Sequence, residues 1–264
     1  MDVPSISPES LYLSLGTVSA PVLVDVRQDA AFDADETMVV GAIRRPPDDV
    51  AAWFDKLPRG HQVVAYCVHG HEVSQGVVAS LREAGIDARL LVGGIEGWRD
   101  AGMPIRRKHG TTPSSWVTRE RPKIDRIACP WLIRRFIDPE ATFLYVPTDR
   151  VLSTAAETGA IAYDIPGAEP FTHDGDLCSY DAVLKVYGIH DAALDRLAVI
   201  VRGADTGRPD LAPQAAGLLA ISLGLSANHH NDHAMLGHGM LVYDALYAWC
   251  RSLQAETHNW KQPA

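Results

Sequence analysis

The sequence contains few cysteines and no closely spaced pair of them. The four cysteines, Cys67, Cys129, Cys178 and Cys250, lie far apart in a chain of 264 residues, and none belongs to a C-x-x-C motif. This distribution excludes a disulfide scaffold and a cysteine-rich zinc site. Each cysteine therefore has to be judged by its own surroundings.

Long apolar runs are also absent. No segment approaches the ~20 consecutive apolar residues that a membrane-spanning helix requires. The first residues, MDVPSISPESLYLS, have neither the basic region nor the apolar region of a signal peptide. We therefore expect a cytoplasmic protein without a membrane partner. Its 47% apolar content is typical of a globular protein that buries a core.

Positive charge is scarce overall but concentrated in one segment. The formal net charge is −9, which opposes nonspecific binding of nucleic acid by the whole chain. Residues 106–135 contain nine Lys or Arg and two acidic residues, so this segment carries +7 and the remainder −16. A solvated face and an anion-binding surface are both compatible with such a run. The candidates for an anion-binding surface are Arg121, Lys123, Arg126, Arg134 and Arg135; the last two are adjacent and cannot share one helix face.

The first hundred residues alternate between strand and helix patterns. Residues 22–26, 62–67 and 88–94 are apolar runs rich in β-branched residues, which predict strands buried on both faces. Residues 48–57 and 72–85 have helical spacing. This alternation predicts an α/β domain over residues 1–105, with a parallel sheet between helices.

The pattern changes after a basic segment that is rich in Pro, Ser and Thr. Residues 106–115 are predicted to be a linker, and residues 116–264 a second domain. Only 142–147 and 159–167 resemble strands there, so we expect a mainly helical domain with a small sheet, with Pro130 in the first turn of a helix. Helical spacing occurs at 131–137, 179–188, 192–204, 213–225 and 235–253.

Cys67 stands at the end of a predicted buried strand, and a helix is expected to begin within residues 72–75. Backbone amides of the intervening loop could surround the sulfur, and together with the helix dipole they would favour the thiolate. Gly70 supplies the backbone freedom that such a loop needs. The alternative is a buried, unreactive cysteine, since free cysteine is among the most buried residue types.

This region resembles the rhodanese (sulfurtransferase) family in four segments. They are LVDVRQDAAFD with Asp25 and Arg27, GAIRRP, the Cys67 loop, and LVGGIEGWRDAGMPI, which together span about residues 8–105. The resemblance implies that Cys67 carries a sulfane sulfur as a persulfide, with Asp25 and Arg27 in support. It also implies small-molecule sulfur donors, thiol acceptors and no cofactor. The loop that would hold the persulfide comprises Val68, His69, Gly70, His71, Glu72 and Val73.

Glu72 departs from the family pattern, because hydroxyl-bearing or basic residues are frequent late in this loop. A carboxylate at the mouth of the site would repel anionic sulfur donors. Thiosulfate is therefore expected to be a poor substrate.

The second domain contains two clusters of possible metal ligands. FTHDGDLCSYDAVL and ANHHNDHAMLGH combine histidine with aspartate near expected helix starts. His229 and His233 are four residues apart, so one helix would place them on the same side, as a divalent cation requires. Asn231 or Asp232 would equally serve as a helix N-cap.

Residues 113–252 resemble the C-terminal domain of ChrB-type chromate resistance proteins. The resemblance lies in RPKIDRIACPWLIRRFID, YDIPG, THDGDLCSYD, IVRGADT and YDALYAWCR, in this order. It implies a role in chromate resistance, with chromate or a related oxyanion handled or sensed. Among polar residues in or beside these motifs, the candidate ligands for a divalent transition metal are His173, Asp205, Asp232 and His233.

Three functions follow from these two resemblances. The first is a rhodanese-type sulfurtransferase coupled to a chromate-resistance domain. The second is a chromate-responsive DNA-binding regulator, which the basic segment favours and the overall acidity opposes. The third is a non-catalytic sensor of an oxyanion or a metal.

Overall fold

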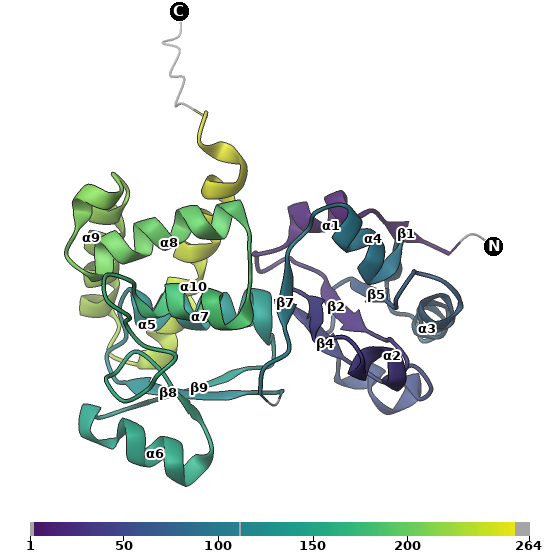
Figure 1. Ribbon diagram of the computed structural model, residues 1–264, viewed down its shortest axis with the longest axis horizontal. Helices are drawn as coiled ribbons and strands as arrows, with labels where there is room; N and C mark the ends of the chain where they lie inside the picture. The colour runs from purple at the N-terminus through teal and green to yellow at the C-terminus, as the bar shows by residue number, and fades with distance from the viewer. Residues whose placement is uncertain (1–2, 111, 257–264) are drawn as a thin grey trace, which may run out of the picture.

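The computed structural model describes residues 3–110 and 112–256. Figure 1 shows two lobes side by side, the N-terminal half in purple and blue and the C-terminal half in teal, green and yellow. The predicted combination of an α/β half and a mainly helical half with a small sheet is confirmed.

The N-terminal half is built on a parallel sheet of five strands in the order β1-β6-β5-β2-β4. All three strands predicted from apolar runs belong to it. The strands are β1 (Ser5–Ile6), β2 (Val22–Asp25), β4 (Ala42–Arg44), β5 (Val63–Tyr66) and β6 (Ala88–Leu91). The helices of this half are α1 (Pro8–Ser14), α2 (Asp29–Asp33), α3 (Glu72–Glu83) and α4 (Gly94–Asp100).

The helix predicted over residues 48–57 is instead two short 3₁₀ turns, η1 (Val50–Ala52) and η2 (Phe54–Lys56). They are separated at Trp53, whose φ of −134° is outside the helical range. The indole of Trp53 is buried and donates a hydrogen bond to the carbonyl of Pro46 at 2.9 Å. The backbone at Trp53 therefore interrupts the helix, while its side chain is buried.

The predicted linker needs correction at both ends. Arg106 and Arg107 belong to β7 (Ile105–Arg107), which pairs antiparallel with β3 (Thr37–Val39). Ser115 is the first residue of β8 (Ser115–Arg119). The composition of the segment concealed β7, because strand pairing to a distant partner leaves no period in three residues.

The C-terminal half packs helices on a parallel sheet of three strands in the order β10-β8-β9. Its remaining strands are β9 (Thr142–Val146) and β10 (Ile161–Ala162). Its helices are α5 (Asp125–Leu132), α6 (Val151–Thr158), α7 (Ser179–Tyr187), α8 (Ala192–Asp205), α9 (Ala215–Asn228) and α10 (Asp232–Ala248). Shorter turns are η3 (Ile133–Ile137), η4 (Thr148–Arg150), η5 (Pro209–Leu211) and η6 (Trp249–Leu253).

Pro130 does not begin a helix as predicted but lies inside α5. Proline has no N–H to donate, so the carbonyl four residues earlier, that of Arg126, lacks its usual helical partner. The hydroxyl of Tyr163 donates to this carbonyl at 3.3 Å. The Tyr163 hydroxyl, which comes from a different segment, thus takes the place of the missing backbone N–H.

The two halves share one hydrophobic core. A single cluster of buried side chains includes Leu11 and Met38 from the first half and Trp131 and Tyr247 from the second. Polar contacts add to it: the Tyr12 hydroxyl donates to Asp191 at 2.5 Å. The predicted domains therefore form one packed body.

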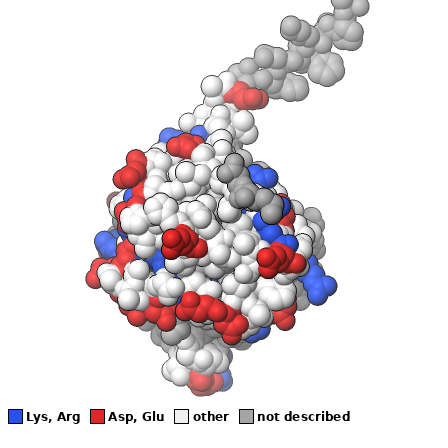
Figure 2. Space-filling view, turned by 90° about the vertical axis from the view of Figure 1, so that its right-hand side faces the viewer, with Lys and Arg blue, Asp and Glu red and all other residues white. Residues whose placement is uncertain are grey.

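Among the described residues, the outer face of the N-terminal half carries no broad basic patch. Figure 2 shows this face, with Asp and Glu scattered around a largely uncharged area and Lys and Arg toward the edges. Among the described residues, no helix is long and apolar enough to cross a membrane.

Candidate functional site

The Cys67 loop lies where the topology of a parallel sheet predicts a ligand site. Cys67 directly follows β5, and α3 begins at Glu72, within the predicted range. Gly70 has a φ of +72°, the left-handed conformation that favours glycine. The loop therefore turns back toward the sulfur, beyond the carboxyl end of a buried strand.

Hydrogen bonds to the Cys67 sulfur define the chemistry of this loop. The Ser74 hydroxyl lies 3.0 Å from the sulfur, and the amides of Gly70, His71 and Ser74 point toward it. Burial raises the pKa of the Cys67 thiol, but these hydrogen bonds outweigh burial, and the pKa lies below its usual value. The thiolate is thus favoured, as the sequence predicted.

The Ser74 hydroxyl has a second partner, the carbonyl of His71 at 3.2 Å. A hydroxyl has one proton to donate. When Cys67 is a thiol, it can donate to Ser74 while Ser74 donates to His71; when Cys67 is a thiolate, Ser74 can donate to the sulfur. Sequence reasoning missed Ser74, although a hydroxyl in the first turn of the helix after the loop is a readable signal.

Backbone hydrogen bonds from the start of α4 hold the Cys67 loop in place. The amide of Ile95 donates to the Cys67 carbonyl at 3.0 Å, and the amide of Glu96 to the Val68 carbonyl at 3.1 Å. A Cβ at Gly94 would lie only 2.4 Å from the Cys67 carbonyl oxygen. The Gly-Gly pair in LVGGIEGW is therefore required by close backbone contact.

A pocket of about 630 Å³ opens over the sulfur. His69 and His71 line it with ring centroids 5.9 Å apart, and Glu72 lies at its edge. The pocket thus has room for a small donor or acceptor above the sulfur. Its other lining residues are Arg27, Gln28, Ala31, Cys67, Val68, Val73 and Gln75.

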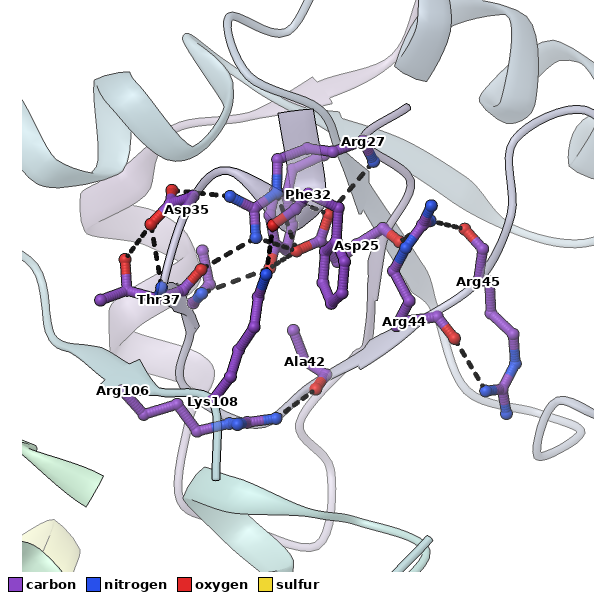
Figure 3. Close-up of polar contacts among 12 residues, drawn as sticks. Asp25, Arg27, Phe32, Asp35, Thr37, Ala42, Arg44, Arg45, Arg106 and Lys108 are labelled. Carbon is purple, nitrogen blue, oxygen red and sulfur yellow. Dashed lines mark hydrogen bonds and ion pairs between the residues drawn. The ribbon is translucent and has the colours of Figure 1, made fainter. Parts of the chain in front are cut away.

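Asp25 and Arg27 form a buried pair at the carboxyl end of β2, and Figure 3 shows their contacts. Both side chains are at most 1% exposed, and Arg27 donates two hydrogen bonds to one Asp25 oxygen, at 2.6 and 3.1 Å. Asp25 also accepts from the hydroxyl of Tyr66, the residue before Cys67, at 2.9 Å. The pair therefore fixes the strand ends below the pocket, and Arg27 also lines the pocket itself.

The basic residues of the C-terminal half contact protein groups within the fold. Arg121 donates to the Ser226 carbonyl at 2.6 Å and Arg126 to the Glu120 carbonyl at 2.9 Å. Arg134 and Arg135 point to different partners, the Ala141 carbonyl and the Asp244 carboxylate. Lys123 is half-buried. The structure thus uses most of this predicted anion surface for internal contacts.

His173 is placed with three carboxylates from separate segments. Its Nε2 lies 3.2 Å from Asp205, 3.5 Å from Asp164 and 3.7 Å from Asp125. His173 follows β10, Asp125 begins α5 and Asp205 ends α8. The predicted pair of His173 and Asp205 is therefore brought together, with Asp125 and Asp164 as additional members.

Electrostatics in this cluster follow from its excess of negative charge. Burial, together with the charges of Asp164 and Asp205, raises the pKa of Asp125 to about 8. A hydrogen bond to Asp164, opposed by desolvation and aided by the other carboxylates, raises the pKa of His173 to about 9. The three carboxylates thus stabilise a positive charge placed among them.

Asp232 and His233 lie apart from this cluster, so the predicted four-residue ligand set is corrected. Asp232 accepts from the amide of Arg121 at 3.0 Å, and the His233 ring packs on Tyr145. His229 caps the end of α9, whereas His233 belongs to α10. Their expected spacing on one helix fails because the chain turns between them at Asn231, which is the N-cap of α10.

Asp125 and Asp164 were missed as candidates. Both occur in motifs quoted above, Asp125 in RPKIDRIACP and Asp164 in YDIPG. For each residue, the sequence signal was only that an aspartate lies inside one of the quoted motifs, with no histidine near it. Only the packing of the motifs reveals their proximity.

The fold and the Cys67 loop define a rhodanese-like domain, and the comparisons agree. The rhodanese-like domain family matches residues 7–101. Thiosulfate sulfurtransferase GlpE of Actinobacillus succinogenes is 32% identical over 109 residues, 41% of this chain and 95% of that protein. A rhodanese-related protein from Thermoplasma volcanium, of known crystal structure, is 25% identical with a TM-score of 0.34, covering 39% of this chain and 96% of that one.

The C-terminal half gives the family of the whole chain. The ChrB C-terminal domain family matches residues 116–250, half of the sequence, so the chain belongs to that family. Protein ChrB of Cupriavidus metallidurans is 39% identical over 133 residues, which are 50% of this chain and 39% of that protein. This chain thus covers well under half of ChrB. The predicted fusion of a rhodanese-like domain with a ChrB C-terminal domain is confirmed.

Proposed function

We propose that this protein is a sulfurtransferase in which Cys67 carries a sulfane sulfur as a persulfide, and that it acts in chromate resistance. The observation that carries the proposal is the set of hydrogen bonds around the Cys67 sulfur at the carboxyl end of β5. Groups that stabilise a thiolate also stabilise an anionic persulfide, because both place negative charge on sulfur in the same loop.

In the first step, the Cys67 thiolate attacks the outer sulfur of a donor R–S–S⁻. The S–S bond of the donor breaks, its thiolate leaves, and Cys67 becomes Cys67–S–S⁻. With thiosulfate as donor, sulfite would leave instead. In the second step, an acceptor thiolate attacks the terminal sulfur, takes it as a new persulfide, and Cys67 returns to the thiolate. Each step exchanges one S–S bond for another, so no external oxidant or reductant is needed.

The lining of the pocket favours some donors over others. Glu72 and the two histidines border the opening, and Arg27 is committed to Asp25 and Asp35. A carboxylate near the sulfur raises the free energy of a bound dianion such as thiosulfate. We therefore favour a small organic persulfide as donor and a small thiol as acceptor.

The role in chromate resistance rests on the family of the C-terminal half. Reducing chromate oxidises thiols to disulfides, and a sulfurtransferase would form persulfides on the remaining thiols as a further source of electrons for that reduction. A DNA-binding regulator is less well supported, since the arginines of the basic segment contact carbonyls and carboxylates of the same chain. Few of them are free to neutralise phosphates, on which affinity for DNA depends.

The direct test is to incubate the purified protein with an organic persulfide and examine its peptides by mass spectrometry. We expect one added sulfur on the Cys67 peptide, and its transfer to glutathione on a second incubation. Cys67→Ser should lower the transfer rate at least ~100-fold, because the nucleophile is lost.

Cys178→Ser is the matched control. Cys178 is buried at the N-cap of α7, a position that serine occupies well. This variant should fold and transfer sulfur at the rate of the unsubstituted protein. Absence of the added sulfur from Cys67 in a folded protein, or equal transfer by Cys67→Ser, would contradict the proposal.

A further inference from the structure

The cluster of Asp125, Asp164, His173 and Asp205 has a chemistry that sulfur transfer does not use. It lies in the C-terminal half, and its members come from four separate places in the chain. Three carboxylates around one imidazole repel a dianion such as chromate, so the bare cluster is not an oxyanion site. Its donor set instead suits a cation.

The spacing of the atoms agrees with a metal site. Metal bonds of about 2.1 Å place neighbouring ligand atoms about 3.0–3.5 Å apart in octahedral or tetrahedral coordination. The imidazole Nε2 lies 3.2, 3.5 and 3.7 Å from oxygens of Asp205, Asp164 and Asp125. The ligand atoms of Asp125, Asp164 and His173 all lie within 4.8 Å of one another. Only small movements would bring these three side chains into one coordination shell, and Asp205 lies beside His173.

Asp125 provides an independent reason to expect a cation. Its carboxylate is fully buried, and among residues 3–110 and 112–256 no lysine or arginine forms an ion pair with it. It accepts hydrogen bonds from the amides of Ser179 and Tyr180 and from the weakly donating thiol of Cys129. Burying a carboxylate without a full counter-charge is costly. A divalent ion would supply that charge.

The surroundings orient the oxygens as neighbours of metal ligands do. Ser179 contacts two of them: its amide donates to Asp125 at 2.6 Å and its hydroxyl to Asp164 at 3.0 Å. Arg119 holds the other oxygen of Asp164 at 2.8 Å. Such outer contacts fix the orientation of ligating side chains.

The site can be reached from solvent. The side chain of His173 is 40% exposed and that of Asp205 is 20% exposed, whereas Asp125 and Asp164 form the buried floor. An ion could enter at the histidine and keep water or another ligand on its outer side. We propose that these four side chains bind one divalent metal ion, with manganese(II) as the representative of the class.

The choice of ion follows from the donors. Carboxylate oxygens favour manganese and magnesium, whereas imidazole favours transition metals over magnesium. Three carboxylates and one histidine therefore point to a first-row ion that accepts both, and away from a thiolate-rich zinc site. The cysteines nearby contact carboxylates by hydrogen bonds, Cys129 with Asp125 and Cys178 with Asp181.

The test uses the full chain, purified without an affinity tag and stripped with a chelator. Titration with manganese(II), followed by electron paramagnetic resonance of the free ion, should show one saturable site per chain. Pulsed electron paramagnetic resonance of the bound manganese(II) should detect one directly coordinated nitrogen, which is that of His173. His173→Gln should remove this nitrogen signal, and Asp205→Asn should weaken binding at least ~10-fold.

Two controls separate the site from adventitious binding. Asp174→Asn removes an exposed carboxylate that neighbours His173 in sequence but pairs with Lys185. His238→Gln removes a histidine that stacks on His229. Both variants should bind manganese(II) like the unsubstituted protein.

Three results would overturn the proposal. One is the lack of saturable binding up to millimolar manganese(II), which would make His173 a protonated counter-ion only. Another is binding without a coordinated nitrogen in the unsubstituted protein. The third is binding that survives Asp205→Asn but is lost in His238→Gln. None of these results depends on sulfur transfer at Cys67.

Discussion

The two polar sites of this protein gather opposite kinds of groups. Around Cys67, backbone amides and the Ser74 hydroxyl point their hydrogens at one sulfur atom. Around His173, three carboxylates direct oxygens at one point. The first arrangement suits an anion and the second a cation. The two sites therefore differ in the sign of the charge that their surroundings stabilise.

The cysteines show the same contrast within one residue type. Hydrogen bonds hold the pKa of Cys67 below its usual value, whereas burial raises the pKa of Cys250 to about 11. Cys67 follows a strand end where loop amides are free, while Cys250 lies within a helical segment whose amides are already used. Position relative to the backbone therefore decides the reactivity of a buried thiol.

The largest expected effect tests whether the two halves, although chemically different, are one folding unit. Asp25→Asn should destabilise the protein by about 3–5 kcal/mol, because it leaves the buried Arg27 without its main counter-ion. Since the halves share a core, the loss should appear in both. Urea unfolding, with hydrogen exchange of α8 as a reporter of the C-terminal half, measures this.

Asp29→Asn is the control, because Asp29 pairs with Arg44 at a largely exposed position. It should change stability little. Unchanged exchange of α8 in Asp25→Asn, despite a destabilised N-terminal sheet, would show that the halves unfold separately.

A smaller effect should be confined to the Cys67 site and leave the His173 cluster unchanged. Gly94→Ala places a Cβ against the Cys67 and Val68 carbonyls, at 2.4 and 2.5 Å, and so has to displace the loop. We expect sulfur transfer to fall at least ~10-fold, because misplaced catalytic groups lose rate steeply. Manganese(II) binding in the C-terminal half should be unaffected.

Gly102→Ala is the matched control. Gly102 also has a positive φ, of +68°, but a Cβ there meets open space. This variant carries only the conformational strain, about 1–2 kcal/mol, and should keep its transfer rate. Equal losses of transfer in the two variants would mean that contact with the loop is unimportant.

The smallest effect concerns the acidity of Cys67. A thiol whose pKa is lowered is ionised over a pH range in which an ordinary cysteine is protonated. The alkylation rate of Cys67 with iodoacetamide should therefore rise with a midpoint below that of an ordinary cysteine. Ser74→Ala should move this midpoint upward, since it removes the hydroxyl nearest the sulfur.

Cys178 serves as the internal comparison in the same experiment. It should stay unreactive while the protein is folded, since burial raises its pKa. A midpoint for Cys67 at or above that of a free cysteine would contradict the assignment of its loop. Mass spectrometry of the alkylated peptides follows both residues at once.

The Cys67 loop was more predictable than the His173 cluster for a physical reason. Its functional groups lie within the eight residues from Cys67 to Ser74, so a strand, a turn and a helix start describe it almost completely. The roles of Ser74 and of the glycines at the start of α4 were not predicted. The ligands of the cluster extend from residue 125 to residue 205, and no local pattern links them.

The contacts of the basic segment could not be predicted from the sequence for a related reason. A sequence shows that charges are concentrated, but not whether they face solvent or another part of the chain. Arg121 reaches the end of α9 and Arg135 reaches α10, contacts that span about a hundred residues. The partners of Arg121 and Arg135 therefore could not be predicted from the local sequence.

The sequence by itself determined the alternation of strand and helix in the first half, the mainly helical second half, the two domain families and the place of Cys67 at a strand end. These features depend on periodicity, turn residues and motifs, which act over a few neighbouring residues. Tertiary structure alone decided that Asp125 and Asp164 join His173, and that β7 ties the supposed linker to β3. It also decided that both halves share one core, because packing, and not local preference, brings distant residues together.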